Sequence, residues 1–295
     1  MSKKMISIIT TSYNCEKYIE ATIQSVVEQD VPVQYIVMDA ASTDGTKEVI
    51  DKYKSSIDVV VSEADEGMYH GIQKGSSYVK GEIMAWINAD DAYLPWTFSI
   101  VEEIFQKFPE IDWIVGQPAY MNKKGQCIKV SSNGGSAYPN KYIKNGWFRP
   151  QFAGYLQQES MFWRKSLWDK VGGLNLDIKL AADFDLWMQF AKHADLYAVA
   201  TPLSLFRYRL GEQQSSVCGE RYANEVESVC EGKESPNLLW RLLSKYSDNL
   251  RVLVRLMIWK KAKILTYSIT DSVWVIKDKY RPLSRYSIAE ILRGY

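Results

Sequence analysis

The stretch "AWINADDAYLP", Ala85–Pro95, decides the fold because it places two adjacent aspartates directly after an apolar run. The run "EIMAWI" predicts a buried strand, so Asp90 and Asp91 follow the point where that strand ends. Like charges this close repel each other, and each carboxylate raises the pKa of the other. We therefore expect either a cation beside the pair or an exposed turn.

The same order of elements occurs four times in the first hundred or so residues. Each time, a short apolar and β-branched segment precedes a segment whose apolar residues have helical spacing. The predicted strands span 5–13, 33–39, 57–63 and 82–88, and the predicted helices span 14–29, 42–54, 69–81 and 95–108. This alternation predicts an α/β fold with a mostly parallel central sheet flanked by helices.

Polar side chains follow all four predicted strands. Because ligands bind beyond the carboxyl ends of the strands in such sheets, we expect the functional site on this rim. The residues concerned are Tyr13 and Asn14, Asp39, Glu63, Asp65 and Glu66, and Asn88, Asp90 and Asp91.

Composition excludes several classes of protein. A net charge of +1 argues against binding nucleic acid through the overall charge, although residues 236–295 are strongly basic, with twelve Lys and Arg against four Asp and Glu. None of the four cysteines forms a C-x-x-C pair, which argues against structural zinc and favours free thiols in a reducing compartment. Without a signal peptide or a membrane-length apolar run, the sequence predicts a cytoplasmic protein.

Motifs along nearly three quarters of the chain resemble those of family 2 glycosyltransferases of the GT-A fold. They are, in order, "SIITTSYN", "VMDAASTDGT", "SEADEGMYHGIQKG", "INADD", "QQESMFWRKSLWDKVGG" and "AADFDLW". The resemblance implies an inverting transfer of a sugar from a nucleotide-sugar to a hydroxyl, usually with Mn²⁺ or Mg²⁺. It also implies a catalytic domain over 1–217, with a nucleotide-sugar-binding half to about residue 115 and an acceptor half after it. A mainly helical, basic extension would follow over 218–295.

Asp90 and Asp91 resemble the D-x-D-type motif of this family. By the resemblance, Asp91 would hold the metal, and Asp90 would face the ribose or the water shell of the metal. The chemistry suits them, because hard cations prefer carboxylate oxygens and stabilise the charge of a departing nucleoside diphosphate. The alternative is an exposed acidic turn before a helix N-terminus, which the helix dipole would favour.

Three residues near the first two strand ends would bind the nucleoside. Asp39 would accept a hydrogen bond from the imide N–H of uracil or thymine, with guanine left open, and a turn or helix-capping role is its alternative. Thr11 and Tyr13 would contact the base and ribose, with core packing as their alternative. Asp44 fits turn chemistry by itself, because "STDG" is a turn sequence.

The motif "SEADEGMYHGIQKG" carries two further candidates. By the resemblance, Asp65 would bind the nucleoside and Lys74 would meet a phosphate or the donor sugar, unless Lys74 is an ordinary solvated helix lysine. His70 and Gln73 depart from the family pattern, in which Asp and Asn are common. These departures leave the identity of the donor sugar open.

An inverting transfer needs a general base opposite the leaving group, and Asp183 in "LAADFDLWMQF" matches that position of the family. Relatives often have an acidic residue one position earlier, where this chain has Ala182. Asp185 falls two residues on, so only one of the two aspartates should face the site. The alternative for Asp183 is a helix N-cap.

The stretch "FRYRLGEQQSS" resembles a late segment in which relatives often carry a metal-binding histidine, and no histidine is present here. Glu212, Gln213 or water would then replace that ligand. Arg207 and Arg209 would instead face the diphosphate, because guanidinium groups suit phosphate oxygens.

A second segment, "LQQESMFWRKSLW", matches a stretch that adjoins the acceptor site in relatives, and Gln157, Gln158 and Glu159 lie in it. Trp163 and Trp168 could form a platform on which a sugar stacks, but buried core aromatics are commoner.

The expected partners are a nucleotide-sugar donor, with a UDP-sugar favoured, and a saccharide or lipid-linked saccharide acceptor of the kind used for bacterial surface polysaccharide or glycolipid. The basic segment "NLRVLVRLMIWKKAKILTY" would rest on an anionic membrane surface, or pack against the catalytic domain or a partner subunit of a homo-oligomer.

Other functions make different demands on the same sequence. A sugar nucleotidyltransferase would need a Gly-rich phosphate loop after the first strand, where this chain has "TTSYN". The missing Q-x-x-R-W motif argues against a processive synthase. A non-catalytic homologue that binds nucleotide-sugar or a partner stays open as the alternative.

Overall fold

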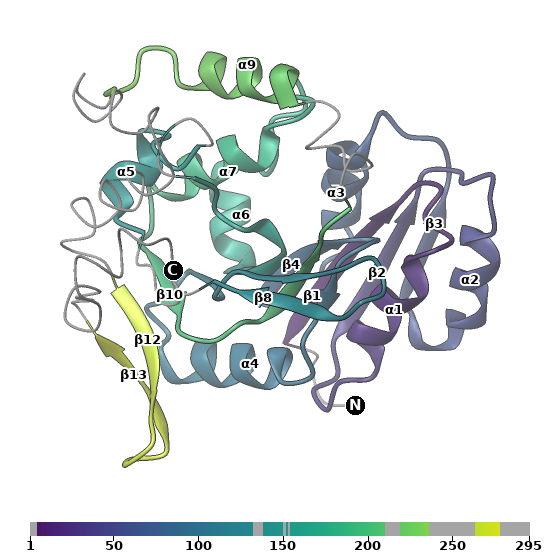
Figure 1. Cartoon of the computed structure of the whole chain (residues 1–295), viewed down its shortest axis with the longest axis horizontal. Coiled ribbons are helices and arrows are strands. Elements are labelled where there is room, and N and C mark those ends of the chain that lie inside the picture. Colours follow the sequence, from purple (N-terminus) through teal and green to yellow (C-terminus); the bar gives the residue numbers. More distant parts are fainter. Residues whose placement is uncertain are drawn as a thin grey trace.

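A nine-stranded sheet forms the centre of the computed structural model, which describes residues 5–131, 138–149, 152, 154–209, 219–235 and 263–277 (Figure 1). The order of the strands is β13-β12-β10-β6-β9-β4-β1-β2-β3. Their bounds are β1 Ile6–Ser12, β2 Gln34–Asp39, β3 Val59–Ser62, β4 Ile83–Asn88, β6 Trp113–Val115, β9 Met161–Arg164, β10 Leu196–Val199, β12 Lys263–Ser268 and β13 Val273–Lys277. The predicted α/β fold class is confirmed.

The first four strands form the parallel half of this sheet, as their apolar sequences predicted. β1 lies between β2 and β4 and is parallel to both, and β2 is parallel to β3. Strand β9 is antiparallel to both β4 and β6, which makes the sheet mixed. The register pairs Ser12 with Asp39, Asp39 with Ser62 and Thr11 with Asn88, so the carboxyl ends of all four strands meet on one rim.

A smaller sheet covers this rim on one side, in the order β5-β11-β7-β8. Its strands are β5 Ala92–Tyr93, β7 Ala119–Met121, β8 Cys127–Val130 and β11 Ser204–Arg207. Because β5 begins directly after Asp91 and pairs with β11, the small sheet fixes the two aspartates relative to the later half of the chain.

The helices pack on the faces and ends of the large sheet (Figure 1). They are α1 Ile19–Val27, α2 Thr46–Lys52, α3 Met68–Ser76, α4 Thr97–Lys107, α5 Asn140–Lys144, α6 Lys165–Val171, α7 Ala182–Phe190 and α9 Gly219–Val229, with short 3-10 turns η1 Lys54–Ser56 and η2 Gln158–Ser160. Helix α9 packs on α7 through a small apolar cluster that joins Val226 to Phe184 and Met188. No described helix is both long and apolar enough to cross a membrane.

Tryptophans fill the core beneath β4 and β9. Trp86 stacks on Trp187 with ring centroids 5.6 Å apart, and Trp163 stacks on Trp168 at 6.1 Å. All four rings are buried. Trp163 and Trp168 are therefore core residues, and the sugar-stacking interpretation of these two is wrong.

The C-terminal segment differs in part from the predicted helical extension. Helix α9 lies there, but Lys263–Ser268 and Val273–Lys277 are antiparallel strands, and β12 pairs in parallel with β10. The hairpin projects from the edge of the sheet (Figure 1). The sequences "KILTYS" and "VWVIK" are β-branched and aromatic, and they give the β10 edge a partner that local periodicity does not reveal. Most of the basic segment at 236–295 lies outside the described residues.

The cysteines that the structure describes agree with the prediction of free thiols. Cys15, Cys127 and Cys230 are free thiols, and Cys218 lies outside the described residues.

Candidate active site

Asp39 ends β2 as a buried carboxylate whose two oxygens are fully hydrogen-bonded. Ser12 Oγ donates to Oδ1 at 3.1 Å and Ser62 Oγ donates to Oδ2 at 2.7 Å. Ser42 donates twice, through its hydroxyl at 2.5 Å and its backbone N–H at 3.1 Å. The carboxylate thus ties the ends of three neighbouring strands and the β2–α2 turn together.

The loops after β1 and β2 are locked to each other beside Asp39. Asn14, at φ 49°, accepts the Thr43 N–H at 2.8 Å, and its own N–H donates to Ser42 Oγ at 2.9 Å. Asp44 accepts the backbone N–H of Thr46 at 3.0 Å and that of Glu16 at 3.2 Å. Asp44 therefore has the turn role that the sequence favoured for it.

Thr11 and Asp65 meet at one glycine of α3. A Cβ added to Gly71 would lie 3.0 Å from Thr11 Cγ2 and 3.0 Å from Asp65 Oδ2, so a side chain there would push both apart. Asp65 is half-buried and accepts the Gly67 N–H at 2.8 Å. Tyr13 is 61% exposed above the same loops.

Lys74 and Gln73 occupy the later part of α3 with different partners. Lys74 forms an ion pair with Glu63, at the end of β3. Gln73 accepts the Leu174 N–H at 2.9 Å and so links α3 to the segment before α7. Gln73 is accordingly a structural contact in this chain.

Asp90 and Asp91 lie beside a cation, which is one of the two alternatives that the sequence predicted for this pair. Asp90 is paired with the guanidinium of Arg209, and its backbone carbonyl accepts Arg207 Nε at 2.6 Å. Asp91 is 1% exposed, and it accepts the Arg207 N–H at 2.8 Å and Asn88 Nδ2 at 3.3 Å. The exposed-turn alternative is wrong for Asp91.

Arg207 fixes the position of the Asp90–Asp91 pair. Its guanidinium donates to the backbone carbonyls of Asn122 and Lys123 at 3.3 and 3.0 Å, and it lies over the Tyr18 ring at 5.1 Å. Burial lowers the pKa of this guanidinium, against the opposing effect of Asp90 and Asp91. Three of its contacts are backbone carbonyls, so Arg207 positions this part of the site.

Glu159 is the site residue whose importance the sequence did not reveal. It lies in η2, is 5% exposed, and its Oε2 has no hydrogen-bond partner among the described residues. Burial, with a smaller effect of the charges of Asp90 and Asp183, raises its pKa from 4.5 to about 8. The sequence placed it only in the stretch that matches the surroundings of the acceptor site in relatives, two residues before the strand "MFWR".

The surroundings of Asp91 suit a divalent cation. Burial raises the pKa of Asp91 well above its ordinary value, and the negative charges of Glu159 and Asp90 add to the effect. No three acidic, His or Cys side chains form a metal cluster within the described ranges. Magnesium-type sites commonly use one or two carboxylates together with substrate phosphates, so this donor set fits. Glu212 and Gln213, the suggested replacement ligands, lie outside the described residues.

Asp183 lies in the first turn of α7, near but not at its N-cap, which is Ala181. Tyr69 Oη donates to Asp183 Oδ1 at 2.8 Å and also approaches the Leu180 carbonyl at 3.0 Å. Burial raises the pKa of Asp183, while the Tyr69 hydrogen bond acts in the opposite direction. Asp185 instead bonds to Gln189 along the helix. The N-cap alternative for Asp183 is wrong.

Helix α9 fixes the start of α7. The Glu225 carboxylate accepts the backbone N–H groups of Lys179, Leu180 and Ala181 at 3.2, 2.7 and 3.0 Å. These contacts join positions more than forty residues apart, so sequence spacing gave no sign of them.

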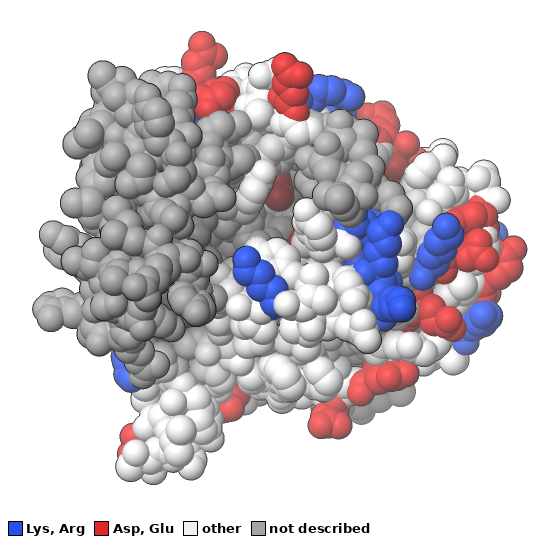
Figure 2. Space-filling model, viewed as in Figure 1, with Lys and Arg blue, Asp and Glu red and all other residues white. Residues whose placement is uncertain are grey.

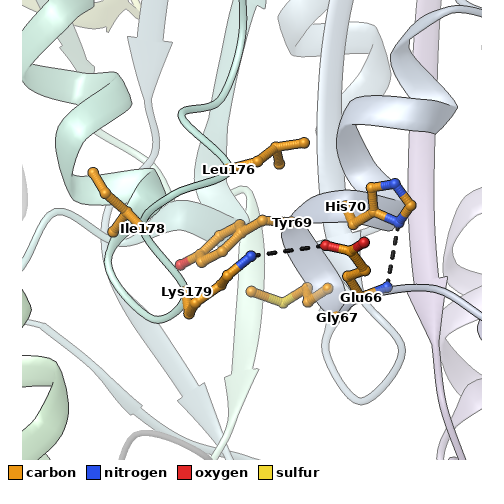
Figure 3. A pocket seen from close by; sticks show the side chains of 8 residues that line it. Glu66, Gly67, Tyr69, His70, Leu176, Ile178 and Lys179 are labelled. Atoms are coloured by element: carbon orange, nitrogen blue, oxygen red, sulfur yellow. Dashed lines mark hydrogen bonds and ion pairs between the residues drawn. The ribbon is translucent and has the colours of Figure 1, made fainter.

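A small pocket opens on the other side of Tyr69, between the start of α3 and the segment before α7 (Figure 3). Lys179 reaches across it toward Glu66 at 3.9 Å, and His70 Nδ1 accepts the Glu66 N–H at 3.3 Å. Tyr69 lines this pocket, and its hydroxyl donates to Asp183. On the molecular surface, acidic atoms are visible inside a hollow near the middle of the face, with Lys and Arg beside it (Figure 2).

Comparisons with known proteins agree with this arrangement. The sequence model described as glycosyl transferase family 2 matches residues 7–170, more than half of the chain. An uncharacterized glycosyltransferase of Haemophilus influenzae is 24% identical over 98% of this chain and 89% of its own length. The Bacillus subtilis protein TuaG, whose name assigns it to teichuronic acid biosynthesis, is 35% identical over 31% of this chain and 38% of its own length.

Two solved structures share the fold at low sequence identity. Staphylococcus aureus TarS with UDP-GlcNAc superposes with a TM-score of 0.61 and 17% identity, over 86% of this chain and 73% of TarS. The mannosyltransferase PcManGT of Pyrobaculum calidifontis, with GDP-Man and Mn²⁺, gives 0.58 and 17%, over 88% of this chain and 75% of its own.

Proposed function

The chain belongs to glycosyl transferase family 2 and is a glycosyltransferase of the GT-A fold, and from this premise we propose an inverting, metal-assisted transfer. A sugar would pass from a nucleoside diphosphate donor to a hydroxyl of a saccharide or lipid-linked acceptor. One arrangement carries the proposal: Asp91 is a buried carboxylate at the end of β4, and Asp183 is a second buried carboxylate fixed by Tyr69 in the first turn of α7. The first suits a metal beside a leaving diphosphate, and the second suits a base.

The nucleotide would lie over the ends of β1 to β3. Asp39 would accept the imide N–H of uracil, and the hydroxyls of Ser42 and Ser62, which rotate freely, would give way to it. The exposed Tyr13 ring would cover the base, with Thr11 and Asp65 below. A UDP-sugar is favoured because a carboxylate acceptor suits the uracil imide, and TarS was solved with such a donor.

The diphosphate would lie beside Asp90 and Asp91. Asp91 would hold Mn²⁺ or Mg²⁺, which stabilises the negative charge of the leaving diphosphate when bound. PcManGT was solved with Mn²⁺, which supports a divalent metal here. Arg209, now paired with Asp90, would turn toward the phosphates, and the phosphates would compete with Glu63 for the ammonium group of Lys74.

Asp183 would take the proton of the attacking hydroxyl. Burial raises its pKa above the ordinary value, which makes its carboxylate a stronger base than an exposed aspartate. The hydrogen bond from Tyr69 fixes one carboxylate oxygen, Oδ1, and the acceptor hydroxyl would approach the other. Glu225, through the backbone before α7, holds the helix that carries this base.

The acceptor would belong to bacterial cell-surface glycan synthesis, as the name of TuaG suggests for that relative. A lipid-linked acceptor would suit the basic segment at 236–295, which we propose contacts an anionic membrane surface.

Product stereochemistry tests this proposal. Purified protein is incubated with Mn²⁺ and a panel of α-linked nucleotide-sugars, and the sugar released by slow hydrolysis is followed by proton NMR. A single displacement predicts that the β-anomer appears first. First release of the α-anomer would contradict inversion, and no turnover of any donor with any acceptor would favour a non-catalytic homologue.

A further inference from the structure

Glu159 stands in a short segment whose other side chains are all anchored. Gln157 bonds to the backbone of Ala119 in both directions, at 3.2 and 3.1 Å, and Gln158 Nε2 donates to the Trp86 carbonyl at 2.7 Å. Ser160 Oγ lies 2.7 Å from Ser204 Oγ. These bonds pin η2 to β4, β7 and β11, so the backbone of Glu159 has little freedom.

Glu159 differs from these neighbours because its carboxyl has an oxygen left over. Oε2 is buried and has no partner within the described part of the chain. Leaving a buried carboxyl oxygen without a hydrogen bond costs on the order of 1–3 kcal/mol. Its chain neighbours Gln157, Gln158 and Ser160 are all hydrogen-bonded, so within η2 the unpaired oxygen is specific to this position.

The position of Glu159 says what would complete it. The hydrogen bonds of Gln158 and Ser160 place Glu159 against β4 and β11, and Asp91, where the diphosphate would leave, follows β4 and accepts the N–H of Arg207 in β11. The charges of Asp90 and Asp183 both raise the pKa of Glu159, which agrees with a position between the two ends of the site. In an in-line displacement, only the transferred sugar lies between leaving group and base. Sugar hydroxyls are hydrogen-bond donors, which is what an unpaired carboxyl oxygen requires.

We propose that Glu159 is a sugar-recognition residue that accepts a hydrogen bond from a ring hydroxyl of the donor sugar. This inference rests on the proposed function and deepens it. A buried acceptor discriminates against donors that cannot reach it, because the carboxyl oxygen is then left unpaired in the complex as well. Glu159 thus determines selectivity for the sugar. Selectivity for the nucleotide is determined separately, in the Asp39 region.

Calorimetric titration of Glu159→Gln and Glu159→Ala tests the proposal. Wild-type protein is first screened with UDP-glucose, UDP-galactose, UDP-GlcNAc and GDP-mannose in Mn²⁺, and the tightest donor is compared with its own nucleoside diphosphate. The measured quantity is the ratio of the two affinities. We expect Glu159→Ala to reduce this ratio about fivefold, as loss of one hydrogen bond predicts, while the affinity for the free diphosphate is unchanged.

Matched controls make the outcomes distinct. Glu103→Gln removes an exposed carboxylate from α4 and should change neither affinity. An unchanged ratio in both Glu159 variants would overturn the inference, and so would an equal loss of affinity for donor and free diphosphate, because that result would assign Glu159 a purely structural role. If wild-type protein bound no donor, the proposed function itself would fail, a different result from an unchanged ratio.

Discussion

The nucleotide end and the reaction end of this site are both rich in carboxylates but differ in how those carboxylates are satisfied. At the nucleotide end, Asp39 receives four hydrogen bonds from serines on three segments. At the reaction end, Asp91 and Glu159 are buried close to each other, and Glu159 keeps an unpaired oxygen.

This difference shows which part of the site has all its hydrogen bonds formed before the substrate binds. The nucleotide end is held by internal hydrogen bonds and needs no ligand to keep its shape. The reaction end carries buried negative charge that favours cations and hydroxyl donors, so binding energy there is reserved for metal and sugar. We therefore expect lower stability at the end where chemistry is proposed, as is common for a functional site.

The largest expected effect comes from changing the base alone. Asp183→Asn keeps the size and the contact with Tyr69 but removes the proton acceptor. We expect transfer to fall about a thousandfold or more while nucleotide affinity stays within twofold. Steady-state assays and calorimetry measure the two. Transfer at the wild-type rate would show that the base lies elsewhere.

The second largest effect is expected from removing the Asp39 carboxylate. Asp39→Ala leaves the buried hydroxyl of Ser12 and the half-buried hydroxyl of Ser42 without their acceptor, so we expect a loss of ~3 kcal/mol in the free energy of unfolding. Asp44→Ala, which removes hydrogen bonds to Thr46 and Glu16 in the exposed loops after β2 and β1, should cost ~1 kcal/mol. Denaturant titration compares the two. Equal costs would mean that the nucleotide end is not held together by Asp39.

Removing the charge at Glu159 should stabilise the reaction end. The folded-state pKa of Glu159 is raised from 4.5 to about 8, so the unfolded chain loses this proton first. Its contribution to stability is therefore full below pH 4.5 and is lost as the pH rises toward 8. We expect Glu159→Gln to melt ~5 °C above wild type at pH 8, with little difference at pH 4.5. If Glu159→Gln melted at a lower temperature than wild type at pH 8, the result would contradict an uncompensated negative charge on Glu159.

The smallest expected effect concerns Tyr69. Its hydrogen bond lowers the pKa of Asp183, so Tyr69→Phe raises that pKa. Because the base must be ionised, the acidic limb of the kcat profile should move to higher pH. The rate at neutral pH should fall about fivefold, as loss of one hydrogen bond predicts. A profile that keeps its wild-type position would separate Tyr69 from the base.

Local patterns predicted the part of the molecule that local physics determines. Apolar runs and helical spacing located β1 to β4 and the rim where Asp39 and Asp91 lie, because strand ends in a parallel sheet must meet there. The β12–β13 hairpin escaped prediction because its pairing with β10 joins Tyr197 to Lys263, far apart in sequence.

The same limit applied within the site. No spacing rule shows that Glu225 would hold the start of α7, or that Arg207 would bond to carbonyls of the β7–β8 turn. Glu159 could be placed near the acceptor region from the sequence. Its unpaired oxygen is a property of packing, which only the folded arrangement reveals.

Thermal unfolding with nucleoside diphosphates tests most directly whether the reaction end awaits a cation. Wild type and Asp91→Asn are heated with UDP, GDP, dTDP or CMP, each with and without Mn²⁺. A ligand that binds the native state raises the melting temperature by mass action. We predict that one diphosphate stabilises wild type far more with Mn²⁺ than without it, and that Asp91→Asn abolishes the Mn²⁺-dependent part. A nucleotide shift that is independent of Mn²⁺, or that survives unchanged in Asp91→Asn, would contradict a metal-assisted transfer at this site.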